Sequence, residues 1–270
     1  MNNHRLRTTG SDAIRAAFDK AGSRGQCALI PYLTLGYPCP ESSVELILAL
    51  QEGGADVIEL GVPFSDPVAD GPTIQAASQA ALRAGMTAHA CLDLVRDARR
   101  AGTTVPIVLM GYYNPIHAYG LREYARDCSE AGVQGLIVPD LPPEEADPLR
   151  QECRREGLAL VFLVAPTTKE ERIAKIASAS EGFVYVVSRL GTTGAGRNPG
   201  AALSDRVALV RRYAHTPVVV GFGIARPEQA KALASVADGV VVGSAVVDKA
   251  KEGTGPLLQY VSTLRRALAR

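Results

Sequence analysis

The sequence predicts one α/β domain over residues 1–270, a single (β/α)8 TIM barrel with an extra N-terminal helix. Short apolar segments alternate with amphipathic stretches along the whole chain, a pattern typical of parallel strands covered by helices. We count eight such segments, and 270 residues suit eight βα units. No long linker, composition shift or low-complexity segment divides them. A doubly wound open sheet is the alternative fold.

The predicted strands are runs of β-branched and other apolar residues. They cover residues 27–35, 55–62, 106–112, 135–140, 159–166, 183–188, 217–223 and 239–245. Helices are predicted where apolar residues recur at helical spacing, near 42–52, 73–84, 87–101, 121–131, 144–156, 169–180, 201–214, 227–236 and 255–269. An additional helix over 11–21 precedes the first strand.

Composition excludes several classes of protein. Apolar residues make up 47% of the chain and charged residues 21%, which is ample for a core and argues against disorder. A formal net charge of +1 gives no electrostatic reason to expect nucleic acid or an anionic membrane as a partner. We find no apolar run long enough for a membrane span and no signal peptide at the start. Five cysteines without ligand spacing indicate reduced thiols in a cytoplasmic protein.

Basic residues and histidines are placed unfavourably for two common mechanisms. The six lysines fall in or beside predicted helices, so a Schiff base inside the barrel is not expected. The four histidines lack metal-ligand spacing, and His89 and His215 lie on predicted helical stretches. We therefore expect no metal site in this chain. With these two mechanisms set aside, we expect acid–base chemistry by carboxylates, on a substrate whose phosphate binds the glycine segments described below.

One segment carries three carboxylates beside a predicted strand. Glu59 lies inside the apolar run 55–62, and the loop that follows contains Asp66 and Asp70. Burying a carboxylate is costly unless it is paired, neutralised or used. The carboxyl end of a barrel strand is where such enzymes hold catalytic groups, so Glu59 is predicted to exchange protons with a substrate. A structural ion pair is the alternative role for Glu59.

Other residues near the strand ends have two interpretations each. Asp70 could cap the helix beginning near Pro72, and Asp66 could be a turn residue. Tyr185 lies in the sixth predicted strand, where its side chain could either pack in the core or line a pocket. Asp140 ends the fourth strand as a helix cap or at the rim of a pocket.

Glycines follow the last three strands, in the segments 191–194, 221–224 and 243–244. Glycine lets backbone N–H groups approach a ligand closely, and a helix starting there favours an anion. Loops after the seventh and eighth barrel strands commonly bind phosphate. A phosphate site is therefore predicted there, without any lysine or arginine.

The segment ELGVPFSDPVADGPTIQ at 59–75 resembles the signature of the tryptophan synthase alpha chain family. The resemblance extends over nearly the whole chain, through PYLTLGYP at 31–38, MGYYNPI at 110–116, GLIVPDLPPEE at 135–145, YVVSRLGTTG at 185–194, GFGI at 221–224 and VVVGSAVV at 240–247. It implies a (β/α)8 lyase of tryptophan biosynthesis that splits indole-3-glycerol phosphate into indole and glyceraldehyde 3-phosphate by a retro-aldol route.

The resemblance also implies roles for individual residues. Glu59 would be the proton shuttle, Asp70 would stabilise the positive indolenine, and Tyr185 would orient the substrate and Glu59. The substrate and its phosphate would contact Tyr32, Thr193, Gly194, Gly223, Gly243 and Ser244.

A partner is implied as well. Alpha chains generally bind a beta chain, which holds pyridoxal phosphate and receives indole through a tunnel, so no cofactor is expected in this chain. The match places Asp66, Pro67, Asn114 and the Pro142–Pro143 pair in the contact loops. An α2β2 heterotetramer is expected, with weak activity of the isolated chain.

One loop departs from the family pattern. Many members carry valine or isoleucine where this chain has Thr192, and two extra glycines and a proline follow before residue 201. Closure of this loop and its coupling to the partner therefore stay open. Two alternative functions also stay open: a free-standing lyase that releases indole, and a catalytically silent regulatory subunit.

Overall fold

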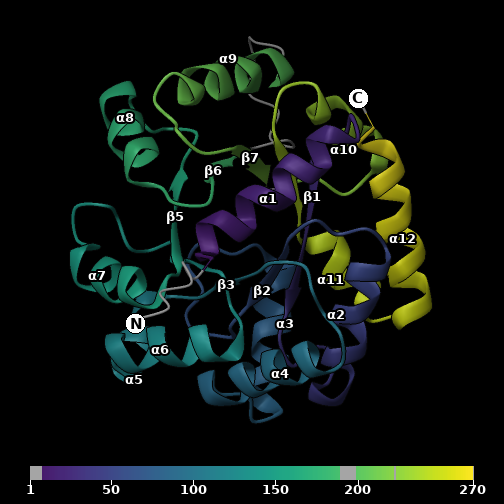
Figure 1. Cartoon of the computed structure of the whole chain (residues 1–270). Coiled ribbons are helices and arrows are strands. Elements are labelled where there is room, and N and C mark those ends of the chain that lie inside the picture. Colours follow the sequence, from purple (N-terminus) through teal and green to yellow (C-terminus); the bar gives the residue numbers. More distant parts are fainter. Residues whose placement is uncertain (1–7, 189–198, 222, 270) are drawn as a thin grey trace, which may run out of the picture.

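The fold was obtained as a computed structural model, which describes residues 8–188, 199–221 and 223–269 (Figure 1). Within these residues, eight parallel strands pair in chain order and close into a barrel, because the last strand also pairs with the first. The strands are β1 (Ala28–Thr34), β2 (Ile58–Gly61), β3 (Ile107–Met110), β4 (Gly135–Ile137), β5 (Ala159–Val164), β6 (Val184–Val187), β7 (Val218–Gly221) and β8 (Gly239–Val242). The predicted TIM barrel is thereby confirmed, with strands shorter than the sequence suggests.

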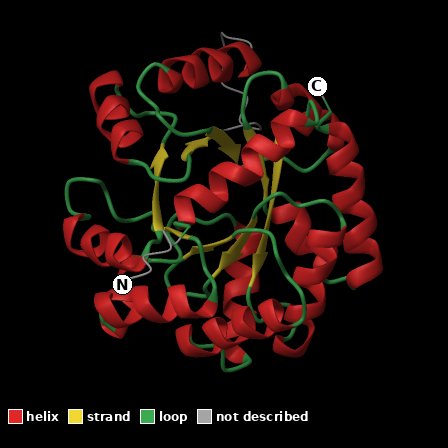
Figure 2. Cartoon of the chain, viewed as in Figure 1, coloured by secondary structure: helices red, strands yellow, loops and turns green. Residues whose placement is uncertain are grey.

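Helices surround the strands on all sides (Figure 2). They are α1 (Gly10–Ser23), α2 (Ser43–Glu52), α3 (Pro72–Arg83), α4 (Ala88–Arg100), α5 (Tyr113–Tyr119), α6 (Leu121–Ala131), α7 (Asp147–Glu156), α8 (Glu170–Ala179), α9 (Pro199–Arg211), α10 (Pro227–Ala234), α11 (Ser244–Ala250) and α12 (Thr254–Ala267), with a short 3-10 turn, η1 (Pro40–Ser42). The sequence did not predict α5, α11 or η1. His215 lies in a bend after α9 rather than in a helix, which corrects its predicted position.

Side chains alternate between two apolar clusters along each strand. On β2, Ile58 and Leu60 belong to the cluster between strands and helices, whereas Val57, immediately before the strand, belongs to the cluster inside the barrel. Successive strand residues point to opposite faces. Glu59, two residues after Val57, therefore points into the barrel.

The additional N-terminal helix closes one end of the barrel. Helix α1 begins at Thr9, whose side chain accepts the N–H of Asp12 in a capping box. Its residues Ile14 and Phe18 belong to the cluster inside the barrel, and the Phe18 ring lies 6.1 Å from that of Phe183, directly before β6. Figure 1 shows α1 lying across the barrel. The amino-terminal end is thus filled, and the opposite end remains for a site.

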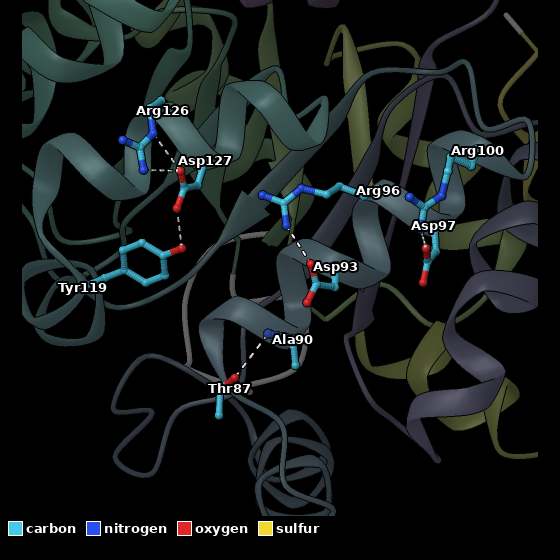
Figure 3. A network of polar contacts seen from close by, with 9 residues as sticks. All are labelled: Thr87, Ala90, Asp93, Arg96, Asp97, Arg100, Tyr119, Arg126 and Asp127. Atoms are coloured by element: carbon cyan, nitrogen blue, oxygen red, sulfur yellow. Dashed lines mark hydrogen bonds and ion pairs between the residues drawn. The ribbon is translucent and has the colours of Figure 1, made fainter.

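Charged side chains of α4 form ion pairs with one another (Figure 3). Thr87 caps the helix, and ion pairs join Asp93 to Arg96 and Asp97 to Arg100. These pairs are spaced by three residues and largely solvent-exposed, so each adds little to stability.

Candidate functional site

A cavity of about 270 Å³ lies at the carboxyl ends of the strands. It is lined by side chains from the interior of the barrel and by loop residues that follow β2, β7 and β8: Tyr32, Glu59, Asp70, Gly71, Ile74, Met110, Tyr185, Gly223, Ile224, Ala225, Val241, Gly243 and Ser244. Every predicted catalytic or substrate-binding residue is present except Thr193 and Gly194, which lie outside the described residues. The structure therefore gathers the separate sequence signals at one cavity.

Glu59 is the most buried charged group of the cavity. Its register partners are Tyr32 on β1 and Val108 on β3, and only 1% of the residue is exposed. Its Oε2 atom has no hydrogen-bond partner. Burial, followed by the negative charge of Asp70, raises the pKa of Glu59 from 4.5 to about 8. A buried carboxyl with such a pKa can give and take a proton near neutral pH.

Asp70 reaches the same cavity from the loop between β2 and α3. Gly71, not Asp70, is the N-cap of α3, and Pro72 is its first residue; the interpretation of Asp70 as the cap is wrong. Burial raises the pKa of Asp70 from 3.8 to about 6, while a hydrogen bond from Tyr112 lowers it. The Oδ1 atom is buried without a hydrogen-bond partner. At neutral pH Asp70 is therefore mostly ionised and Glu59 mostly protonated.

Two tyrosines in the barrel interior share one packing arrangement. A Cβ atom placed on Gly61 would lie 1.9 Å from the Tyr32 hydroxyl, and one on Gly221 would lie 2.2 Å from the Tyr185 hydroxyl. Gly61 on β2 pairs with Thr34 on β1, two residues after Tyr32. Gly221 on β7 pairs with Val187 on β6, two residues after Tyr185. Each glycine thus provides the space for a phenol at the cavity wall. Tyr185 lines the cavity as predicted, and burial raises its pKa well above 10.

Backbone from the last two βα loops forms the rim of the cavity. Gly223, two residues after β7, has a φ of 74°, which favours glycine. Gly243 follows β8 and is the N-cap of α11, with Ser244 as the first helical residue. A short helix directly after the eighth strand is typical of barrels that bind phosphate. The first turn of α11 therefore opens toward the cavity.

Tyr112 is a functional candidate that sequence reasoning missed. It is buried next to the end of β3, and its hydroxyl accepts the N–H of Ala69 at 2.9 Å. The rule that identified Glu59, a polar group at the carboxyl end of a strand, would have selected Tyr112 within MGYYNPI.

Asp140 has a contact at the first turn of α5. Its carboxylate accepts the N–H of Tyr113, the first residue of that helix, at 2.9 Å.

The residues expected to contact a partner lie on three consecutive loops. Asp66 and Pro67 follow β2, Asn114 is the second residue of α5 after β3, and Pro142 follows β4. Asp66 and Asn114 are exposed, and Pro67 and Pro142 are partly exposed. Neighbouring parallel strands bring these loops to one sector of the rim.

Comparison with known proteins gives a family. A sequence profile described as tryptophan synthase alpha chain matches residues 18–267. The chain is 47% identical over 255 residues to the tryptophan synthase alpha chain of Dehalococcoides mccartyi, covering 94% of this chain and 97% of that one. It is 48% identical over 260 residues to that of Geobacter sulfurreducens, covering 94% and 98%. The chain belongs to the tryptophan synthase alpha chain family.

Solved structures agree with this assignment. The tryptophan synthase subunit alpha of Legionella pneumophila superposes with a TM-score of 0.86 at 38% identity, covering 95% of this chain and 98% of that one. The predicted family and its activity, cleavage of indole-3-glycerol phosphate, are thereby confirmed. Membership also implies a beta-chain partner, which generally holds the pyridoxal phosphate of the complex.

Two further observations concern sites of other kinds. Among residues 8–188, 199–221 and 223–269, no group of three or more histidine, cysteine or acidic side chains could hold a metal ion. No helix in that same part of the chain is long and apolar enough to cross a membrane.

Proposed function

We propose that Glu59 and Asp70 divide the lyase chemistry between a proton shuttle and a fixed negative charge. The observation that carries this proposal is that two buried carboxyl groups, with pKa values raised to about 8 and about 6, line one cavity. Titratable pairs whose pKa values differ in this way commonly divide acid and base roles.

Cleavage of the carbon–carbon bond needs a group that accepts its electron pair. Protonated Glu59 gives its proton to the indole ring carbon that carries the side chain, which converts the ring to a positive indolenine. Glu59, now a carboxylate, takes the proton of the adjacent side-chain hydroxyl. The bond then breaks, its electrons return to the ring, and indole and the aldehyde of glyceraldehyde 3-phosphate are formed. Glu59 ends as it began.

Asp70 acts by its charge. As a carboxylate it accepts the N–H of the ring and stabilises the positive indolenine, and a fixed charge of this kind needs no rearrangement during the reaction. Its unpartnered Oδ1 suits this role. Ile74, Met110 and Val241 supply apolar lining for the ring.

The remaining cavity residues hold the substrate. Backbone at Gly223, Gly243 and Ser244 accepts the phosphate, because unpaired N–H groups at a helix start favour an anion. Thr193 and Gly194 are proposed to complete this cradle on family resemblance alone. Tyr32 on β1 and Tyr185 on β6 orient the ring and the Glu59 carboxyl.

The complex is proposed to be an α2β2 heterotetramer in the cytoplasm. The loops carrying Asp66, Pro67, Asn114 and Pro142 form the contact with the beta chain, and the exposure of these residues supports this. Cys39, Cys91, Cys128 and Cys153 are free thiols, as suits a reducing compartment.

An indole-release assay with indole-3-glycerol phosphate tests the proposal. The purified chain is expected to turn over slowly alone and at least about tenfold faster with a beta chain, because docking orders the loops at the cavity. Equal rates would favour a free-standing lyase. No turnover in either case would favour a silent regulatory subunit.

A further inference from the structure

We propose that Tyr112 is a positioning residue that fixes the Asp70 carboxylate and the loop carrying it to the rigid end of β3. This inference rests on the proposed role of Asp70. Tyr112 lies two residues after β3 and is only 4% exposed. It is also the N-cap residue of α5, and the preceding residue, Gly111, donates its N–H to the Ile137 carbonyl at the end of β4.

The Tyr112 side chain contacts the loop between β2 and α3 at two points. Its hydroxyl accepts the N–H of Ala69, the residue directly before Asp70, at 2.9 Å. Its ring lies 5.2 Å from that of Phe64. A phenol has one donor and can accept two bonds, so its proton stays free for the Asp70 carboxylate, whose pKa the hydroxyl lowers.

The loop needs such an anchor. Ser65, Asp66, Val68 and Ala69 are all exposed, and loops of this kind move more than the strands they join. Catalytic groups held on loops are less accurately placed than groups on strands, unless a second set of contacts fixes them. Glu59 is placed by β2 itself. The main chain of Asp70 is bonded to Pro67 and to the Gln75 side chain, and Tyr112 adds the contact to the end of β3 through Ala69.

The same contact affects protonation of Asp70. Its hydrogen bond with Tyr112 opposes the effect of burial and keeps the pKa lower. The other titratable groups coupled to Asp70 are Glu59 on β2, Tyr32 on β1 and Tyr185 on β6. Among Tyr112 and these three groups, Tyr112 is the one that lowers the pKa of Asp70 and so favours its ionised form. Its loss should move the titration of Asp70 to higher pH.

The substitution Tyr112→Phe removes the hydroxyl and keeps the ring. We expect kcat for indole release to fall about 10- to 100-fold, the loss typical of one hydrogen bond to a charged group. The acid limb of the pH profile should move to higher pH, and KM should change little because the phosphate cradle is untouched. Tyr119→Phe is the matched control: that hydroxyl donates to the Asp127 carboxylate at 2.7 Å on the outside of the barrel (Figure 3). Its turnover and pH profile should match wild type.

Titration of Asp70 by carbon-13 NMR in the ligand-free protein separates this inference from the proposed function. A higher pKa of Asp70 in Tyr112→Phe than in wild type supports positioning, even if wild type releases no indole. An unchanged pKa with turnover within about twofold of wild type overturns it. An equal loss of turnover in Tyr119→Phe also overturns it, since a general packing defect would then account for both.

Discussion

The Tyr185 hydroxyl occupies the space that a side chain at Gly221 would need: a Cβ there would lie 2.2 Å from the hydroxyl oxygen and 2.7 Å from the ring carbon that bears it. The two residues lie on adjacent strands at the wall of the cavity. The absence of a side chain at Gly221 on β7 therefore leaves the space that the Tyr185 phenol from β6 occupies. Burial, followed by the negative charge of Glu59, raises the pKa of Tyr185.

Gly221→Ala is expected to displace Tyr185 and impair catalysis. Overpacking of this kind costs about 1–3 kcal/mol of unfolding free energy, and turnover should fall about tenfold or more. Tyr185→Phe removes the nearest atom, so the stability costs of the two substitutions should be less than additive in a double-mutant cycle. Gly255→Ala, with no atom within 4 Å of the new Cβ, should not lower stability. Additive costs would contradict the contact.

The pH dependence of kcat/KM should be bell-shaped, with limbs near 6 and near 8. On the acid side, activity rises as Asp70 loses its proton and gains the charge that stabilises the indolenine. On the alkaline side, activity falls as Glu59 loses the proton it must donate. Steady-state kinetics with the beta chain present measures both limbs. A profile that is flat across both values would contradict the assigned protonation states.

Asp70→Asn should lower turnover by about 100-fold or more, because a neutral amide cannot balance a positive ring as a carboxylate does. Since Gly71 is the cap of α3, the free energy of unfolding should not decrease. Kinetics and denaturant unfolding on the same protein check the two statements. Normal turnover with a loss of stability would leave Asp70 with a purely structural role.

Gly243→Val should raise KM about tenfold with a smaller effect on kcat, because the side chain enters the phosphate cradle. The empty protein accommodates a Cβ there, since its nearest neighbours are Ile74 at 3.6 Å and Tyr32 at 3.9 Å. Gly223 is a poorer test, because its φ of 74° makes any side chain strained. An unchanged KM for indole-3-glycerol phosphate would argue against the cradle.

Sequence patterns predicted the strands and helices that are marked by a local run or spacing of apolar residues. Each strand has its own apolar run, and the position of Glu59 inside such a run was enough to predict a buried carboxyl, which the structure places at the cavity. The same holds for α1, where Ile14 and Phe18 are four residues apart on one face. These features depend on neighbours in the chain.

Features that depend on distant contacts could not be predicted in this way. The loop that carries Asp70 is contacted by Tyr112, whose hydroxyl accepts the N–H of Ala69 from 43 positions further along the chain, and α5 begins where Asp140 accepts the N–H of Tyr113. Helix α11 is only seven residues long and begins with the mostly apolar segment SAVV, so its start was included in the predicted eighth strand. Short apolar segments do not distinguish strand from helix by period alone.

The most direct test of the account is indole release by Glu59→Gln with the beta chain present. Turnover should fall about 100-fold or more, while binding of a phosphate-bearing ligand stays close to wild type. Because the pKa of Glu59 is about 8 in the folded protein and near 4.5 when unfolded, ionisation favours the unfolded state and wild-type stability falls as pH rises through that range. Glutamine cannot ionise, so the variant should be more stable than wild type above that range, which verifies its fold. A variant that keeps more than about a tenth of wild-type turnover would contradict Glu59 as the proton shuttle.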